Sequence, residues 1–166
     1  MQRVSSLPGR WRILVFFLAA SLVVVADQLS KTWVRSNIPL WQSMPETGWV
    51  RLTHICNSGA AFGQFQGQRE LLIAAAFVGI ALLLAYILFA YRRFPMLDGT
   101  LSRVALGLVL GGTIGNLIDR LRLGCVTDFV DFGFWPAFNV ADSSTVVGVI
   151  ILIGLLILLP ARAGKN

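Results

Sequence analysis

Residues 71–91 form a run of 21 residues without a charged side chain, between Glu70 and Arg92. About 20 apolar residues suffice for a helix to cross the hydrocarbon core of a bilayer, so this run alone predicts a transmembrane helix. The rest of the chain agrees, since 56% of its residues are hydrophobic and only 13% are charged. A chain of 166 residues with this composition has room for four spans in a single integral membrane domain over residues 1–166.

Three further segments complete a four-span prediction. Residues 143–161 are a second uncharged run, and residues 104–118 form a shorter one, beside which Arg103 can extend its charge to the membrane surface. The segment 13–26 has only 14 uncharged residues, a length that also fits a cleaved signal peptide. If Asp27 faces the interior of the bundle, the same segment reaches about residue 29 as a retained helix, which is the interpretation we prefer.

The predicted helices therefore cover about residues 12–29, 71–91, 103–120 and 142–160, with extracytoplasmic loops at 30–70 and 121–141. Eight of the 14 Lys and Arg residues lie on the side of the two termini and six on the other. Because cytoplasmic loops are richer in basic residues, we expect both termini to be cytoplasmic. The fold class is an all-α membrane protein with four transmembrane helices.

The loop 30–70 predicts a small extracytoplasmic surface subdomain. It is too polar to cross the membrane, yet it contains Trp33, Trp41 and Trp49, whose rings favour the headgroup level of a bilayer. We expect short β-strands or an amphipathic helix there. Composition leaves open whether these aromatic side chains anchor the protein or contact a substrate.

The net charge of +6 does not predict a nucleic-acid partner, because the basic residues lie in short clusters beside apolar runs rather than in one stripe. His54 is the only histidine, so no histidine cluster can bind a metal. Cys56 and Cys125 show neither metal-ligand spacing nor a disulfide framework. We expect no metal and no cofactor, and we assign no role to the cysteines.

Polar side chains within or beside the membrane are costly, so each is a candidate for function. These side chains lie at the predicted outer ends of the helices, and they are Asp27, Asn116, Asp119, Arg120, Asp128, Asn139 and Asp142. On the third helix, Gly107, Gly111 and Gly115 recur every four residues and predict close packing of a neighbouring helix. Asn116 and Arg120 share the adjacent row and are predicted to face the interior.

Asp128 and Asp142 lie 14 residues apart, around an aromatic loop that can fold back and bring the two carboxyl groups together. Two close carboxyl groups in a site of low dielectric share a proton, and such a pair can activate a water to cut an amide bond. The residues alone leave an alternative open, in which Asp142 caps the fourth helix and Asp128 is a solvated loop residue. Spacing also does not exclude Asp131 from the pair.

Five short motifs follow one another along the chain: 27–31 (DQLSK), 57–62 (NSGAAF), 112–120 (GTIGNLIDR), 126–129 (VTDF) and 138–142 (FNVAD). In this order, on a four-span chain of this length, they resemble the lipoprotein signal peptidases, also called signal peptidase II. The resemblance implies an aspartic endopeptidase of the bacterial inner membrane, with its active site at the extracytoplasmic face. Its substrate is then a prolipoprotein, cut just before a cysteine that already carries a diacylglyceryl group.

The resemblance also assigns residues. It implies that Asp128 and Asp142, hereafter the aspartate pair, are catalytic and that Asp131 is not. The residues implied to bind substrate or position the pair are Asn57, Asn116, Arg120, Asn139, Asp27 and Lys31. Whether Asp27 and Lys31 touch substrate or hold the fold is left open. The expected partners are the prolipoprotein and membrane lipid, with no nucleic acid, and we expect a monomer.

Two other classes of function compete with a protease. A transporter also keeps carboxylates in its helices, but near the bilayer midplane, where the second and fourth predicted helices carry none. A structural subunit explains the glycine face but not the aspartate motifs. A presenilin-like protease would carry a Gly-x-Gly-Asp sequence, which does not occur in this chain.

Overall fold

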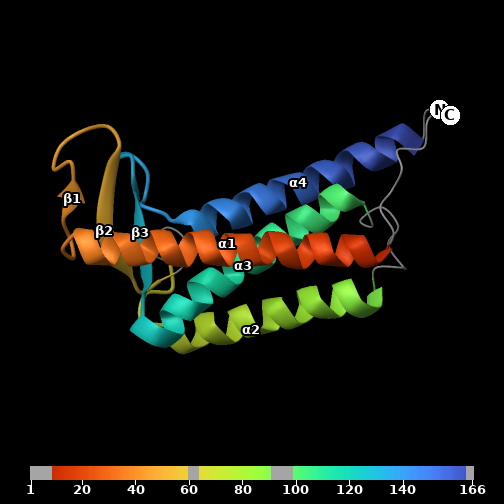
Figure 1. Cartoon of the computed structure of the whole chain (residues 1–166), viewed down its shortest axis with the longest axis horizontal. Helices are drawn as coiled ribbons and strands as arrows, with labels where there is room; N and C mark the ends of the chain where they lie inside the picture. The colour runs from red at the N-terminus through yellow and green to blue at the C-terminus, as the bar shows by residue number, and fades with distance from the viewer. Residues whose placement is uncertain (1–8, 60–63, 91–98, 164–166) are drawn as a thin grey trace.

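The computed structural model describes residues 9–59, 64–90 and 99–163. Its elements are the helices α1 (Gly9–Asn37), α2 (Arg69–Ala85), α3 (Thr100–Leu123) and α4 (Val140–Ala163), the π-helical turn η2 (Tyr86–Ala90) that continues α2, and the strands β1 (Ser43–Met44), β2 (Arg51–Asn57) and β3 (Val126–Asp131). Within the described ranges, four helical segments are long and apolar enough to cross a membrane. The helices run alongside one another, with the strands gathered at one end (Figure 1). The predicted four-helix membrane fold with a small surface subdomain is confirmed.

Helix α3 is the centre of the bundle and packs against α1, α2 and α4. Its glycines let the backbone of α1 approach closely. A Cβ atom added at Gly107 would lie 2.6 Å from the carbonyl oxygen of Phe16, and one added at Gly111 would lie 2.6 Å from that of Ala20. The predicted small-residue face is therefore confirmed, and α1 is the helix that occupies it.

Gly107→Ala is expected to lower the free energy of unfolding by about 1–3 kcal/mol, because the added methyl group must push α1 away from α3. Gly79→Ala is the matched control, since nothing lies within 4 Å of a Cβ atom added at Gly79 on α2. There the better helix propensity of alanine should leave stability unchanged or raise it by up to about 1 kcal/mol. Thermal unfolding in detergent measures both, and equal midpoints for the two variants would contradict the close packing.

Helix α1 is longer than predicted. Residues 30–37, expected in the surface loop, form its last two turns, and the helix ends at Asn37. Lys31 and Arg35 follow Asp27 at a spacing of four residues, so all three lie on the face of α1 that meets α3. Ion pairs on this face hold the extra turns in helical conformation. Since α1 packs along α3, the structure favours the retained helix over the signal-peptide interpretation.

The three strands form an antiparallel sheet in the order β1-β2-β3. The pairing of β2 with β3 brings the Cα atoms of Cys56 and Cys125 to 5.5 Å, and the two residues form a disulfide. The sequence analysis assigned no role to the cysteines, and the structure gives them one as a cross-link between two strand ends. Their separation of 69 residues concealed a contact that depends on the register of two distant strands.

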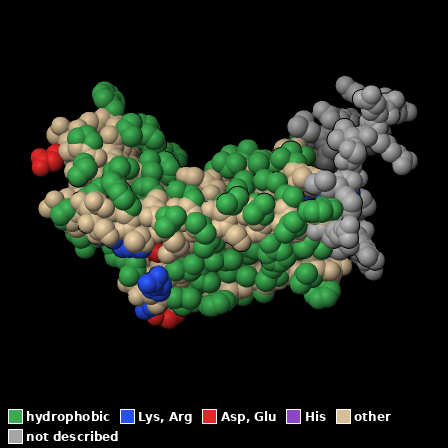
Figure 2. Space-filling model, in the orientation of Figure 1, with side chains coloured by type: hydrophobic (Ala, Val, Ile, Leu, Met, Phe, Trp, Pro, Cys, Tyr) green, Lys and Arg blue, Asp and Glu red, His purple; other side chains and the backbone are tan. Residues whose placement is uncertain are grey.

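The surface of the bundle suits a lipid environment. Many large hydrophobic side chains on the outward faces of the helices are exposed, Leu22, Leu82 and Ile150 among them. Over the described part of the face in Figure 2, hydrophobic side chains cover the helices, whereas most Lys, Arg, Asp and Glu side chains lie toward the end that carries the sheet. This change from apolar to polar surface marks where the hydrocarbon layer would end.

Candidate active site

The strand β3 and the first turn of α4 bring the aspartate pair together. Asp128 and Asp142 both line one cavity of about 680 Å³, which is bounded by α2, α3, α4 and the loop 135–138. Both carboxyl groups are bonded to the same residue, Asn139. Its side-chain amide donates to Asp128 Oδ1 at 2.7 Å, and its backbone N–H donates to Asp142 Oδ2 at 3.2 Å. The aromatic loop folds back as expected, because Val130 of β3 pairs with Phe138.

Asp142 is a helix cap and a cavity residue at once. Its backbone N–H donates to Asn139 Oδ1 at 2.8 Å, while its own Oδ2 accepts the backbone N–H of Asn139. This reciprocal pair has the pattern of a capping box at the start of α4. The second oxygen, Oδ1, accepts a hydrogen bond from Asn116 Nδ2 at 2.8 Å. A part in the cap and a place in the cavity are therefore compatible, because the cap uses Oδ2 and the bond from Asn116 uses Oδ1.

Asp128 is only 3% exposed and lies at the wall of the cavity. Burial raises the pKa of its carboxyl group to about 7, and the neighbouring charge of Asp142 adds to the rise. Hydrogen bonds from Asn57 and Asn139 and the charge of Lys31 oppose this rise in pKa. An ordinary aspartate is fully ionised at neutral pH, whereas Asp128 retains a proton for a substantial fraction of the time.

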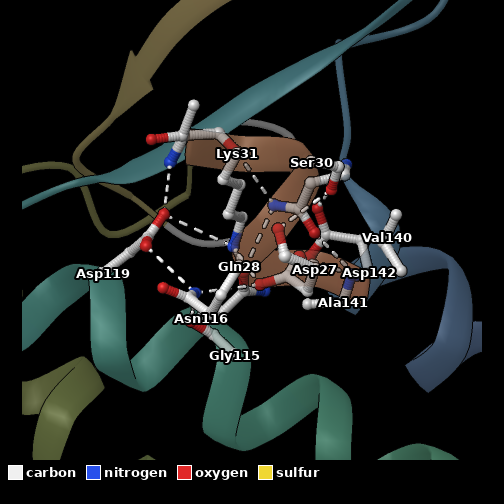
Figure 3. Close-up of polar contacts among 12 residues, drawn as sticks. Asp27, Gln28, Ser30, Lys31, Gly115, Asn116, Asp119, Val140, Ala141 and Asp142 are labelled. Carbon is white, nitrogen blue, oxygen red and sulfur yellow. Dashed lines mark hydrogen bonds and ion pairs between the residues drawn. The ribbon is translucent and has the colours of Figure 1, made fainter. Parts of the chain in front are cut away.

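A fully buried cation lies behind the aspartate pair. Lys31 Nζ donates to Asn116 Oδ1 at 2.9 Å and forms ion pairs with Asp27 at 2.8 Å and Asp119 at 3.3 Å. Figure 3 shows Lys31 and Asp27 reaching from α1 toward α3 and α4. The cavity wall includes Asn116 but not Lys31 or Asp27. Lys31 therefore meets the aspartate pair through Asn116, which touches Asp142.

Two buried carboxylates fix the two elements that carry the aspartate pair. Asp27 Oδ1 accepts the backbone N–H of Ala141 at 3.0 Å, which holds the first turn of α4 against α1. Asp119 Oδ2 accepts the backbone N–H of Thr127 at 2.9 Å, which holds β3 against α3. Gln28 donates its side-chain amide to both carboxylates, at 3.1 and 3.2 Å. Because α4 and β3 are fixed to the same cluster, Asp128 and Asp142 have a defined separation.

Part of the cavity wall is held from α3. Arg120 lines the cavity and donates from Nη2 to the carbonyl oxygen of Gly59 at 3.0 Å. Asn57, at the end of β2, also lines the cavity and donates to Asp128 Oδ2 at 2.9 Å. Amide and guanidinium donors therefore surround the carboxyl groups, while Ala76, Val146 and Val147 give the opposite wall an apolar character.

Comparison with known proteins decides the family. Residues 19–158 match the family described as Peptidase_A8, signal peptidase (SPase) II. The chain belongs to the signal peptidase II family. Relatives named lipoprotein signal peptidase include one from Dehalococcoides mccartyi, 48% identical over 147 residues that cover 89% of each chain. Another, from Moorella thermoacetica, is 44% identical over 152 residues, which cover 91% of this chain and 98% of the relative.

The fold of this signal peptidase II chain is also found among solved structures. A structure described as a bacterial membrane enzyme superposes with a TM-score of 0.76 and 28% sequence identity, covering 91% of both chains. A second, with the same description, has a TM-score of 0.71 and 30% identity. The helices, the sheet and their connections therefore follow a fold shared with experimentally determined enzymes.

The site residues predicted from the sequence of this signal peptidase II chain fall into two groups, those that line the cavity and those buried behind its wall. The nominated residues that line the cavity are Asp128, Asp142, Asn57, Asn116 and Arg120. Asn139, Asp27 and Lys31 are fully buried behind the wall. The alternative carboxylate, Asp131, bonds instead to Arg51 at 2.5 Å, and the cavity lining does not include it. Among the described residues, no cluster of three His, Cys, Asp or Glu side chains could hold a metal ion.

Sequence reasoning kept Asp119 among the general candidates without assigning it to the site, and it did not name Gln28. Both stand inside the motifs at 112–120 and 27–31, so the signal was present in the sequence. Asp119 was read as a residue at the membrane edge, because nothing in the spacing shows that it meets Lys31 and Thr127. Both of those contacts depend on how α1 and β3 lie against α3.

Proposed function

We propose that this protein is a membrane aspartic endopeptidase that removes the signal peptide from bacterial prolipoproteins, cutting just before the lipid-modified cysteine. The observation that carries the proposal is the aspartate pair, two carboxyl groups bonded to one asparagine in a single cavity between membrane-spanning helices. The relatives named lipoprotein signal peptidase support the choice of substrate.

The proposed chemistry needs one proton shared by the aspartate pair. Asp142, ionised, accepts a proton from a water molecule as the water attacks the scissile carbonyl carbon. Asp128, protonated, donates toward the carbonyl oxygen, and the resulting tetrahedral gem-diol collapses with release of the amine. The raised pKa of Asp128 supports its role as the proton donor. Asn116 and Asn139 hold the two carboxyl groups in place through the bonds described above.

The proposed location is the extracytoplasmic face of the bacterial inner membrane, with both termini cytoplasmic. The disulfide supports this orientation, because disulfides persist in oxidising compartments rather than in the cytosol, and Cys56 and Cys125 lie beside the site. A lipidated cysteine at this face can leave its acyl chains in the bilayer while the peptide enters the cavity past Ala76 and Val147.

The test is cleavage of a synthetic prolipoprotein peptide by the purified protein in detergent. The peptide is supplied with and without a diacylglyceryl group on its cysteine, and the products are identified by mass spectrometry. We expect a single cut before the cysteine of the modified peptide only. Equal cutting of both peptides would overturn the lipid requirement, and no cutting of either would favour the transporter or the structural subunit.

The rate of cleavage is expected to fall as the pH rises through about 7. A raised pKa keeps Asp128 protonated below that value, and the proton donor is lost above it. Initial rates on the lipidated peptide at saturating concentration, in buffers spanning both sides of neutrality, measure this limb. A rate that keeps rising through pH 7 into the alkaline range would show that a protonated Asp128 is not required.

A further inference from the structure

The Cys56–Cys125 disulfide lies next to the aspartate pair in both chain segments that it joins. Cys56 directly precedes Asn57, and Cys125 lies three residues before Asp128. Both cysteines are half-buried, and neither lines the cavity. The cross-link therefore cannot act on a substrate directly, but it can act through its neighbours.

The end of β2 that carries Asn57 is held by a short stretch of the β2–β3 ladder and by one bond from α3, in which Arg120 donates to the carbonyl oxygen of Gly59 at 3.0 Å. The pairing of β2 with β3 is irregular between Leu52 and Ile55, and only the three pairs from Ile55 to Asn57 follow before the strand ends. Asn57 donates to Asp128 at 2.9 Å and accepts the backbone N–H of Gly59 at 2.9 Å. A shift of this strand end away from β3 would lengthen the hydrogen bond from Asn57 to Asp128.

The disulfide joins this strand end to a rigid support. Cys125 follows Gly124, which ends α3 in a left-handed conformation (φ 83°) and donates its N–H to the carbonyl oxygen of Arg120. The cross-strand neighbour of Cys56 is Thr127, so the covalent link reaches beyond the ladder to the end of the central helix. Covalent attachment to α3 limits how far Asn57 can move away from Asp128.

We propose that the Cys56–Cys125 disulfide is a positioning pair that keeps Asn57 hydrogen-bonded to Asp128, so that cleavage depends on its oxidation. The inference rests on the proposed function, and it adds a redox requirement to it. A dithiol reductant supplies two electrons and two protons, the S–S bond breaks, and two thiols form while the dithiol becomes a disulfide.

Reduction of the disulfide should shift the pH dependence of cleavage, an effect that a general loosening of the fold would not produce. Besides Asn57, the charged groups that act on Asp128 are Asp142 from α4, Lys31 from α1 and Arg120 from α3. Asp142 and Lys31 lie on helices that the disulfide does not join, whereas Arg120 bonds to Gly59 beside the cross-linked strand end. Loss of the Asn57 hydrogen bond alone raises the pKa of Asp128 further, because that bond favours the ionised form. The alkaline limb of the rate profile then moves to higher pH.

The experiment compares the oxidised and the dithiothreitol-reduced full chain on the lipidated peptide, at a temperature where both remain folded. Thiol alkylation and mass spectrometry verify the oxidation state. We expect reduction to lower kcat about tenfold, the upper end for losing one hydrogen bond between uncharged groups, and to move the alkaline limb of the rate profile to higher pH. Reoxidation should restore both. The double variant Cys56→Ser with Cys125→Ser should have the kcat and pH profile of the reduced enzyme, and addition of dithiothreitol should change neither.

A variant that already lacks the hydrogen bond to Asp128 tests whether the disulfide positions Asn57 or only stabilises the fold. In Asn57→Ala the hydrogen bond is already absent, so reduction should change neither its rate nor its pH profile. A further tenfold loss in that background, or an unchanged rate for the reduced wild type, would overturn the inference alone. Failure of the oxidised wild type to cut at all would overturn the proposed function and this inference with it.

Discussion

Asp128→Asn and Asp142→Asn are each expected to lower kcat on the lipidated peptide by roughly 10²–10⁴-fold, the range typical of removing a general acid or base. Asparagine has nearly the shape of aspartate, but it neither accepts the proton of the attacking water nor donates one to the carbonyl oxygen. Asn139 and Asn116 can still bond to the remaining amide oxygen, so the fold should persist. The unfolding temperature of each variant in detergent verifies that it does.

Asp131→Asn is the matched control for this pair. Asp131 lies on the same strand as Asp128, three residues further on, so the two side chains point to opposite faces of β3. It bonds to Arg51 and to the backbone N–H of Gly133, away from the cavity lining. Its rate should stay within about threefold of the wild type, as for loss of a partly exposed ion pair. Normal cutting by Asp128→Asn or Asp142→Asn would remove the basis for an aspartic mechanism.

The layer in which the site lies could be predicted from the sequence, because the cost of burying polar groups in lipid leaves few places for them. Each of these places is the end of a long apolar run, which can be found in the sequence alone. The polar residues at such ends include Asp27, Asn116 and Asp142. The glycines of α3 were equally visible, since their spacing of four residues places them on one helix face. Both expectations depend on local periodicity, and the structure confirms that these groups meet.

The choice of partner for Asp128 could not be made from spacing. Asp131 and Asp142 are both close in sequence, and the choice depends on the alternation of β3 and on the pairing of Val130 with Phe138. The disulfide was missed for the same reason, because Cys56 and Cys125 meet only through the register of β2 with β3. Such contacts between distant segments leave no periodic signal in the sequence.

The role of Lys31 was also open, although its spacing from Asp27 was visible. A pair four residues apart on a helix is usually a solvated ion pair of small effect. Here the packing of the helices buries both side chains completely, and α3 adds Asp119 as a second carboxylate. The tertiary packing therefore turns a common surface pattern into a buried charge cluster.

Lys31→Met is expected to lower the free energy of unfolding by about 3–5 kcal/mol, because it leaves Asp27 and Asp119 buried without their main cation. Methionine fills a similar volume, so the loss is one of charge rather than of packing. Asn116 also loses one of the two donors to its side-chain oxygen and keeps only Asn139, while its side-chain nitrogen bonds to Asp142 (Figure 3). Cleavage should therefore fall even where the variant remains folded. Chemical or thermal unfolding in detergent and the peptide assay measure the two effects.

Arg51→Met removes a cation from a comparable pair outside the bundle. The side chains of Arg51 and Asp131 are 29% and 13% exposed, against 0% for both Lys31 and Asp27. Water can solvate Asp131 once its partner is gone, so this variant should lose only about 1 kcal/mol. In the double variant Lys31→Met with Asp119→Asn, one uncompensated charge is removed, and it should be more stable than Lys31→Met alone. Equal losses at positions 31 and 51, with no rescue by Asp119→Asn, would mean that the cluster behind the aspartate pair acts by packing and not by charge.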